Sequence, residues 1–234
     1  MAIDLRSFTP ARVSLGRTGH GLPTDAWLRF ELDHARARDA VYAELDPESL
    51  PKPHLVLRSA VRKRSEYLRR PDLGCRLREE SRSLLTRGEY DASIVIADGL
   101  SATAVHRHAG LVWQALRQRL SGENWRLAPL SLVLQGRVAI GDEIGERLGA
   151  KLVVVLIGER PGLTSPDSLG IYLTWDPRPG RTNAERNCIS NVRAEGIGHE
   201  LAADKLHFLM NAARVRRLSG IQLKEDARLL GPQP

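Results

Sequence analysis

Short apolar runs alternate with polar, glycine-containing turns through most of the chain. The run KLVVVLIG at 151–158 is mostly β-branched or leucine and stops abruptly at the turn GERPG, which is typical of a strand covered on both faces. Comparable runs predict three further strands, at 92–97, across LSLVLQGRV from residue 130, and across GIYLTWDP from residue 170. The pattern therefore indicates a sheet with a deeply buried centre.

Helical spacing of apolar residues fills the intervals between these strands. Ser101 is the predicted N-cap of a helix that continues to about Leu120. The segment DEIGERLG predicts a short helix that stops at Gly149, and apolar spacing predicts a last helix over His199–Leu218. Strands that alternate with helices imply right-handed crossovers. The predicted fold class is therefore α/β, with a Rossmann-like, mainly parallel sheet and flanking helices, preceded by an N-terminal helical segment.

The first third of the chain has a different pattern. Residues 1–23 predict an extended arm, and DAWLRFELDHARARDAVYAEL from Asp25 predicts an amphipathic helix that ends before the proline-rich stretch PESLPKP. A further helix is predicted over Cys75–Leu85. We therefore divide the chain into an arm and helical segment at 1–88 and an α/β domain at 89–234.

Composition and charge disfavour several classes of protein. No apolar run approaches the roughly 20 residues that span a bilayer, and the opening MAIDLRSFTP has no hydrophobic signal core, so a cytoplasmic protein is expected. The formal charge of +7 is compatible with a nucleic-acid partner. However, the arginines are scattered among acidic residues and aromatic stacking platforms are missing, which argues against that partner. Cys75 and Cys188 have no CxxC spacing, so both are expected to be free thiols.

Four segments near predicted strand ends carry the residues best suited to bind a ligand. They are DGLS at 98–101, GRV at 136–138, GERPG at 158–162 and the predicted loop CISN at 188–191. Ligands in open α/β sheets bind beyond the carboxyl ends of the strands, where these segments should converge. Their glycines permit close approach of the backbone to a bulky ligand, so together they predict a cofactor cleft. Taken singly, each residue has an ordinary explanation as a turn or cap residue.

The chemistry of the individual side chains is less specific. Glu159 and Arg160 are adjacent in the chain and therefore seldom face each other, so we interpret them as binding groups rather than a catalytic pair. Cys188 is either a nucleophile or a small buried hydrophobe, and the lack of an orienting histidine beside it favours core packing. His106 and His108 fall on different helix faces, so no metal site is predicted. The sequence has no GxGxxG after its first strong strand and no GxxxxGK[ST], which disfavours the usual dinucleotide and nucleoside triphosphate sites.

A set of motifs occurs in one order along nearly the whole chain. They are GRTG near the start, LRFxxDHxxxxDAV at 28–41, YLxRPDLG at 67–74, DGLS, GRVAIGDEIGERLGAK, IGERPGL and RNCISN. Each motif alone is a weak signal. Together they are specific, and in them the chain resembles the small (light) subunit of ethanolamine ammonia-lyase.

The resemblance implies an adenosylcobalamin-dependent carbon–nitrogen lyase that is active only as a hetero-oligomer. In such an enzyme this chain covers one face of the cobalamin, and a separate large TIM-barrel subunit covers the other, for radical conversion of ethanolamine to acetaldehyde and ammonia. The family's cofactor-binding positions fall on Val138, Glu159 and Cys188, with no catalytic residue and no protein metal ligand assigned to this chain. The absence of a DxHxxG motif implies that the nucleotide base stays on cobalt.

The resemblance also bears on domains, location and alternatives. The α/β domain at 89–234 is then a cobalamin-binding domain, and the protein is placed in the cytoplasm or within a bacterial microcompartment. One alternative is a non-enzymatic module that carries a corrinoid or nucleotide and docks on other proteins. An arginine-rich nucleic-acid binder is the third and least favoured interpretation.

Overall fold

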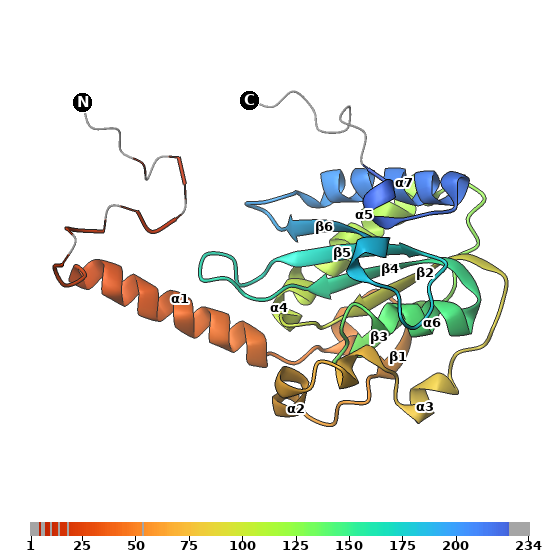
Figure 1. Cartoon of the computed structure of the whole chain (residues 1–234), viewed down its shortest axis with the longest axis horizontal. Helices are drawn as coiled ribbons and strands as arrows, with labels where there is room; N and C mark the ends of the chain where they lie inside the picture. The colour runs from red at the N-terminus through yellow and green to blue at the C-terminus, as the bar shows by residue number, and fades with distance from the viewer. Residues whose placement is uncertain are drawn as a thin grey trace.

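The chain forms a six-stranded sheet with helices on both faces and one helix that projects from the body (Figure 1). A computed structural model describes residues 19–52 and 54–224, together with residues 5, 8, 9, 11–13 and 15–17. The strands are β1 (His54–Arg58), β2 (Tyr90–Ala97), β3 (Leu130–Leu134), β4 (Ala150–Gly158), β5 (Leu169–Trp175) and β6 (Arg186–Val192). The helices are α1 (Thr24–Tyr42), α2 (Arg64–Arg69), α3 (Glu79–Arg82), α4 (Ala102–Ala104), α5 (Gly110–Leu120), α6 (Ile140–Leu148) and α7 (His199–Arg216).

The four strands predicted from apolar runs are confirmed as β2, β3, β4 and β5, and the predicted helices after Ser101, before Gly149 and from His199 are also present. The Ser101 hydroxyl accepts a hydrogen bond from the Ala104 amide at 3.2 Å, which is the predicted cap. Gly149 ends α6 with a φ of 75°, a conformation that glycine adopts without a steric penalty. Local sequence pattern therefore sufficed for these elements.

The sheet is mixed, so the prediction of a mainly parallel sheet was wrong. The strand order is β1-β3-β2-β4-β5-β6, and β5 runs antiparallel to both β4 and β6. Only residues 159–168 connect β4 to β5, and only 176–185 connect β5 to β6. A parallel crossover needs about a dozen residues or more, usually with a helix, so these short connections return the chain antiparallel. The predicted loop at 188–191 is likewise wrong, because these residues lie in β6.

Two apolar cores lie on the two faces of the sheet. On one face α5 and α7 pack on the strands through side chains such as Leu116 and Leu206. On the other face α6 packs through Ile140, Ile144 and Leu148. Alternate residues of the central strands serve the two cores, as the two-residue period of a strand requires. The short α6 packs mainly against β2 and β4 on this face.

The first third of the chain is less helical than predicted. The helix from Asp25 is confirmed as α1, but the helix predicted over Cys75–Leu85 is wrong, since only the four residues of α3 are α-helical there. The Leu77 amide donates to the Glu143 side chain at 2.8 Å, and Leu77 itself is buried, which holds this stretch extended. The apolar piece HLVLRS contributes β1 at the edge of the sheet, paired with β3. No helix in the described part of the chain is both long and apolar enough to cross a membrane.

Candidate functional site

The carboxyl ends of β2, β3 and β4 meet around an open hollow of about 270 Å³. Val138, which precedes α6, and Glu159, which follows β4, both line it, together with Arg160. The convergence predicted for DGLS, GRV and GERPG is therefore confirmed, because each of these segments contributes lining residues. It is produced by the common direction of the three strands.

Two glycines allow the loops after β2 and β4 to touch. Gly99 has a φ of +57°, and a Cβ atom there would lie 2.2 Å from the carbonyl oxygen of Gly158. A Cβ atom on Gly158 would lie 2.1 Å from the carbonyl oxygen of Ser101. Any larger residue at either position would push the two loops apart. The rim of the hollow is thus built from closely packed backbone.

The buried carboxylate of Asp98 ties the end of β2 to the end of β3. It accepts hydrogen bonds from the backbone amides of Gln135 at 2.9 Å and Gly136 at 3.0 Å. Gln135 has a φ of 59°, which is costly for a residue with a side chain, and these bonds hold it there. Burial raises the pKa of Asp98 to about 6, while the nearby Arg64 guanidinium, 3.8 Å away, acts in the opposite direction. We therefore assign Asp98 a structural role behind the rim.

A stacked pair of cationic and aromatic side chains forms one wall of the hollow. The guanidinium carbon of Arg137 lies 4.2 Å from the centre of the Tyr67 ring, and Arg64 lies over the same ring at 4.5 Å. Tyr67 is fully buried, and its hydroxyl donates to the Gly136 carbonyl at 3.0 Å. The buried Nε of Arg137 has no hydrogen-bond partner among the described residues. Arg137 is thus held in place with an unused donor beside the hollow.

The side chain of Glu159 is fixed at the junction of β4, β5 and β6. Its Oε2 accepts hydrogen bonds from the Ser168 hydroxyl and, at 3.3 Å, from the Asn191 amide. Its Oε1 lies beside Gly170, where a Cβ atom would come within 2.9 Å of it. No hydrogen bond to Oε1 occurs within the described residues, so this oxygen is free to accept one from a ligand.

Cys188 lies next to the hollow rather than in its lining. It pairs with Tyr172 across β5 and β6, and Tyr172 lines the hollow. Cys188 is exposed, so the interpretation of core packing was wrong: it lies on β6, the last strand of the sheet, on the same face as Tyr172. Partial withdrawal of the sulfur from water nevertheless raises the pKa of its thiol, which argues against a thiolate nucleophile at neutral pH. Both Cys75 and Cys188 are free, as predicted.

A buried ion pair anchors α6 to β6 beside this site. The Asp142 carboxylate and the Arg186 guanidinium form two hydrogen bonds of 2.6 Å, and their side chains are 1% and 3% exposed. Arg186 also donates to the Thr174 hydroxyl and to the Arg181 carbonyl, each at 2.9 Å. The start of α6, and Val138 before it, are thereby placed relative to the strand that carries Cys188.

The two histidines considered from the sequence take up separate roles. His106 accepts a hydrogen bond from the Asp46 amide at 2.9 Å, and the ring of His108 meets that of His199 at 2.9 Å between α5 and α7. His106 and His108 both lie within a π-helical turn, Val105–Ala109, that joins α4 to α5. No group of three or more His, Cys, Asp or Glu side chains that could hold a metal ion occurs among the residues that the structure describes.

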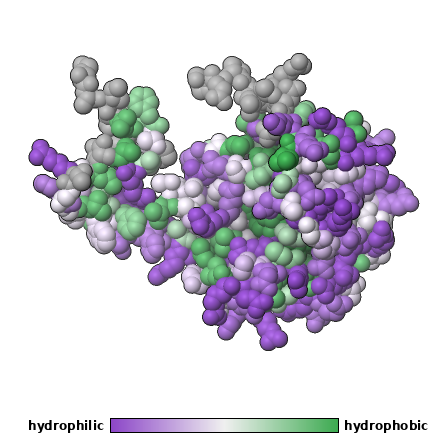
Figure 2. Space-filling model, in the orientation of Figure 1, coloured by the Kyte–Doolittle hydropathy of each residue, from purple (hydrophilic) through white to green (hydrophobic). Residues whose placement is uncertain are grey.

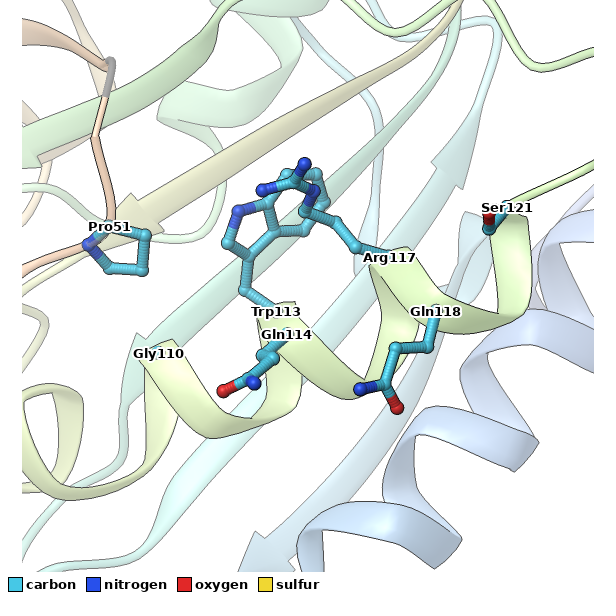
Figure 3. A pocket seen from close by; sticks show the side chains of 7 residues that line it. All are labelled: Pro51, Gly110, Trp113, Gln114, Arg117, Gln118 and Ser121. Atoms are coloured by element: carbon cyan, nitrogen blue, oxygen red, sulfur yellow. The ribbon is translucent and has the colours of Figure 1, made fainter.

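A second hollow, of about 460 Å³, lies along the outside of α5 (Figure 3). Figure 3 shows Gln114 and Gln118 pointing away from the helix, while the Arg117 side chain extends over the Trp113 ring. No strand end or predicted site residue reaches it. We therefore take the strand-end hollow as the candidate site, although it is the smaller of the two.

Three residues of the site were missed by reasoning from the sequence. Tyr67, Arg137 and Tyr172 all line the hollow. Tyr67 and Arg137 stand inside segments already quoted as motifs, YLxRPDLG and GRV, but nothing in their spacing indicated that the two side chains would stack. Tyr172 lies in the middle of a predicted strand, where an aromatic residue ordinarily indicates core packing.

Similarity to known proteins agrees with the motifs. Residues 2–224 match the family model described as Ethanolamine ammonia-lyase light chain (EutC). A protein of Azotobacter vinelandii named ethanolamine ammonia-lyase small subunit is 55% identical, over 97% of this chain and 88% of that protein. Proteins of the same name from Xanthomonas campestris pv. campestris and Pseudomonas fluorescens (strain SBW25) are 52% and 50% identical, over 95% and 97% of this chain and 87% of each relative.

Proposed function

Because this chain belongs to the ethanolamine ammonia-lyase light-chain family and is the small subunit of that lyase, we propose that it holds adenosylcobalamin against a large TIM-barrel subunit. The strand-end hollow is the part of the cofactor site that this chain contributes. The cofactor supplies the radical chemistry when it is bound. The chain itself binds and orients the cofactor and keeps water from one of its faces.

The observation that carries the proposal is the meeting of Val138, Glu159 and Tyr172 on one open hollow, with Cys188 adjacent to Tyr172. A corrinoid is far larger than about 270 Å³, so this hollow accepts one part of it and a second subunit must enclose the rest. Gly170 has no side chain, which leaves room for the Glu159 and Tyr172 side chains to lie over the sheet at the edge of the hollow. The donor set and the shape both fit the group.

Glu159 and Cys188 are proposed to contact the amide-bearing edge of the corrinoid. The free Oε1 of Glu159 accepts hydrogen bonds, and amide N–H groups are suitable donors for a carboxylate. Cys188, a protonated thiol, provides a soft, weakly polar contact rather than a charge. Val138 provides apolar surface at the start of α6. None of these side chains is given a role in bond breaking.

Arg137 and Arg160 are proposed to face the negatively charged part of the cofactor. The nucleotide loop of a cobalamin carries a phosphodiester, and guanidinium groups are well suited to pair with phosphate oxygens. Arg137 is held by its stacking on Tyr67 and has a buried, unused Nε. Arg160 is exposed at the rim and forms no ion pair with any described residue.

Reconstitution tests the proposed function. The full chain, its large partner and adenosylcobalamin are purified separately and mixed in all combinations, and acetaldehyde release from ethanolamine is measured together with cobalamin retained on gel filtration. We expect activity and retained visible absorption only when all three are present. Equal cofactor retention by the large subunit alone would contradict the proposal, even if the mixture were active.

A further inference from the structure

Helix α1 projects from the body of the protein with little of its own surface buried (Figure 1). Among its residues, Thr24–Tyr42, only Ala40 is buried. The N-cap residue of α1 is Pro23, which provides no side-chain hydrogen bond to the first turn of the helix. A helix of this length gains most of its stability from packing an apolar face rather than from propensity. An exposed helix such as α1 is therefore expected to pack against another molecule.

Exposed apolar side chains lie along one side of α1, and together we call them the α1 stripe. Trp27 is 49% exposed, Leu28 61%, Leu32 50% and Tyr42 57%. Leu28 and Leu32 are one helical turn apart, so their side chains adjoin on the same side. Figure 2 shows hydrophobic surface on this projecting part of the molecule. An exposed apolar patch of this kind marks an interaction surface.

The opposite side of α1 is already occupied by the chain's own N-terminal arm. The Arg12 guanidinium pairs with Asp33 at 2.6 Å and lies 5.6 Å from the centre of the Phe30 ring. Arm residues, α1 and Thr164 of the β4–β5 connection together line a hollow of about 280 Å³. The described arm residues therefore account for one side of the helix, and the side chains of the α1 stripe are exposed.

The position of α1 links it to the proposed cofactor site. Arg64 donates from Nε to the Val41 carbonyl of α1 at 2.7 Å and from Nη1 to the Gly99 carbonyl at the rim of the hollow at 2.9 Å. The connection between β4 and β5, which begins at Glu159, also lies near the N-terminal arm, since Thr164 and arm residues line the same hollow. A subunit that closes over the hollow consequently meets α1 at the same end of the sheet.

We propose that the α1 stripe is a docking surface for the large subunit, continuous with the surface that closes the cofactor hollow. This inference rests on the proposed function, because it takes its occupant from the large partner of that enzyme. Two apolar side chains one turn apart, both about half exposed or more, are suited to act as anchors in a groove of the partner. The charged residues elsewhere on α1 stay at the rim of such an interface.

The test is a comparison of binding by full-length variants. Association with the large subunit is measured by sedimentation velocity for the wild type, for Leu28→Ser/Leu32→Ser, and for the control Val215→Ser/Ile221→Ser. The control residues are 82% and 73% exposed and lie at the other end of the chain. We expect the α1 variant to weaken association at least about tenfold and the control to change it by less than about twofold. Circular dichroism checks that both variants are folded.

Hydrogen exchange provides a readout that needs no substitution. Amides of Thr24–Tyr42 should exchange at least about tenfold more slowly in the complex than in the free chain. Unchanged exchange in α1, or equal binding by the α1 variant, would overturn this inference while leaving cofactor binding untouched. If the wild-type chain alone forms a dimer and the Leu28→Ser/Leu32→Ser variant is a monomer, the stripe would instead bind a second copy of this chain, and the inference would be overturned. Failure of the wild type to bind any large subunit would overturn both proposals.

Discussion

Replacing Asp142 with asparagine should destabilise the protein strongly, because it leaves the Arg186 guanidinium buried without its counter-charge. The two side chains are 1% and 3% exposed and share two bonds of 2.6 Å. Removing one partner of a buried ion pair costs about 3–5 kcal/mol. This is a large fraction of the roughly 5–15 kcal/mol by which a domain is usually stable. The melting temperature of a chain of this size should fall by about 6–20 °C.

Urea unfolding followed by circular dichroism measures this loss directly. Glu89→Gln is the matched control, because Glu89 and Arg126 form an ion pair of 2.9 Å in which both side chains are largely exposed. Exposed pairs contribute about 0–1 kcal/mol, so this variant should unfold almost as the wild type does. If Asp142→Asn lost no more than Glu89→Gln, the reasoning about burial would be refuted. The double variant Asp142→Leu/Arg186→Met should be more stable than Asp142→Asn, since it buries no unpaired charge.

Three further outcomes are expected. Glu159→Gln should weaken cobalamin retention by the complex about tenfold with little loss of stability, because the carboxylate at the hollow becomes a neutral amide. The control is Glu195→Gln, at an exposed glutamate. Equal cobalamin retention by the two variants would count against the proposed site. Gly170→Val should abolish cobalamin retention while the fold persists, because a Cβ atom at this position would lie 2.9 Å from Glu159 Oε1 and 3.1 Å from Tyr172 Cε2 and would displace both side chains. Retention of the normal cobalamin absorption spectrum after gel filtration would contradict this prediction. Burial raises the pKa of Asp98 from 3.8 to about 6. Because the pKa is higher in the folded state, protonation of Asp98 contributes fully to stability below pH 3.8, and this contribution is lost as the pH rises through 6. A carbon-13 NMR titration of the Asp98 carboxyl with a midpoint near 4 would contradict the raised pKa.

Reasoning from the sequence was most successful where one segment determines its own structure. The runs that became β2, β3 and β4 are almost wholly apolar, and the caps at Ser101 and Gly149 act on their own helices. It was least successful where the structure depends on a partner distant in the chain. Leu77 is extended because its amide meets Glu143, and no local pattern at 75–85 reveals that contact.

The candidate site shows the same division. The segments containing Val138 and Glu159 could be placed at strand ends from the sequence, since polar residues after buried strands indicate the rim of an α/β sheet. The roles of Tyr67, Arg137 and Tyr172 could not, because stacking and cross-strand pairing depend on which elements become neighbours. The exposed position of Cys188 likewise depends on the placement of β6 at the edge of the sheet.

The sequence by itself determined the family of this protein, its α/β class and the loops that carry the candidate site, because ordered motifs and hydrophobic periods are written along the chain. Only the tertiary structure decided that β5 runs antiparallel, that Glu159 keeps one oxygen free, and that the α1 stripe is exposed. The physical reason is that strand direction, hydrogen-bond saturation and exposure are relations between segments far apart in the chain, and local pattern encodes them only weakly.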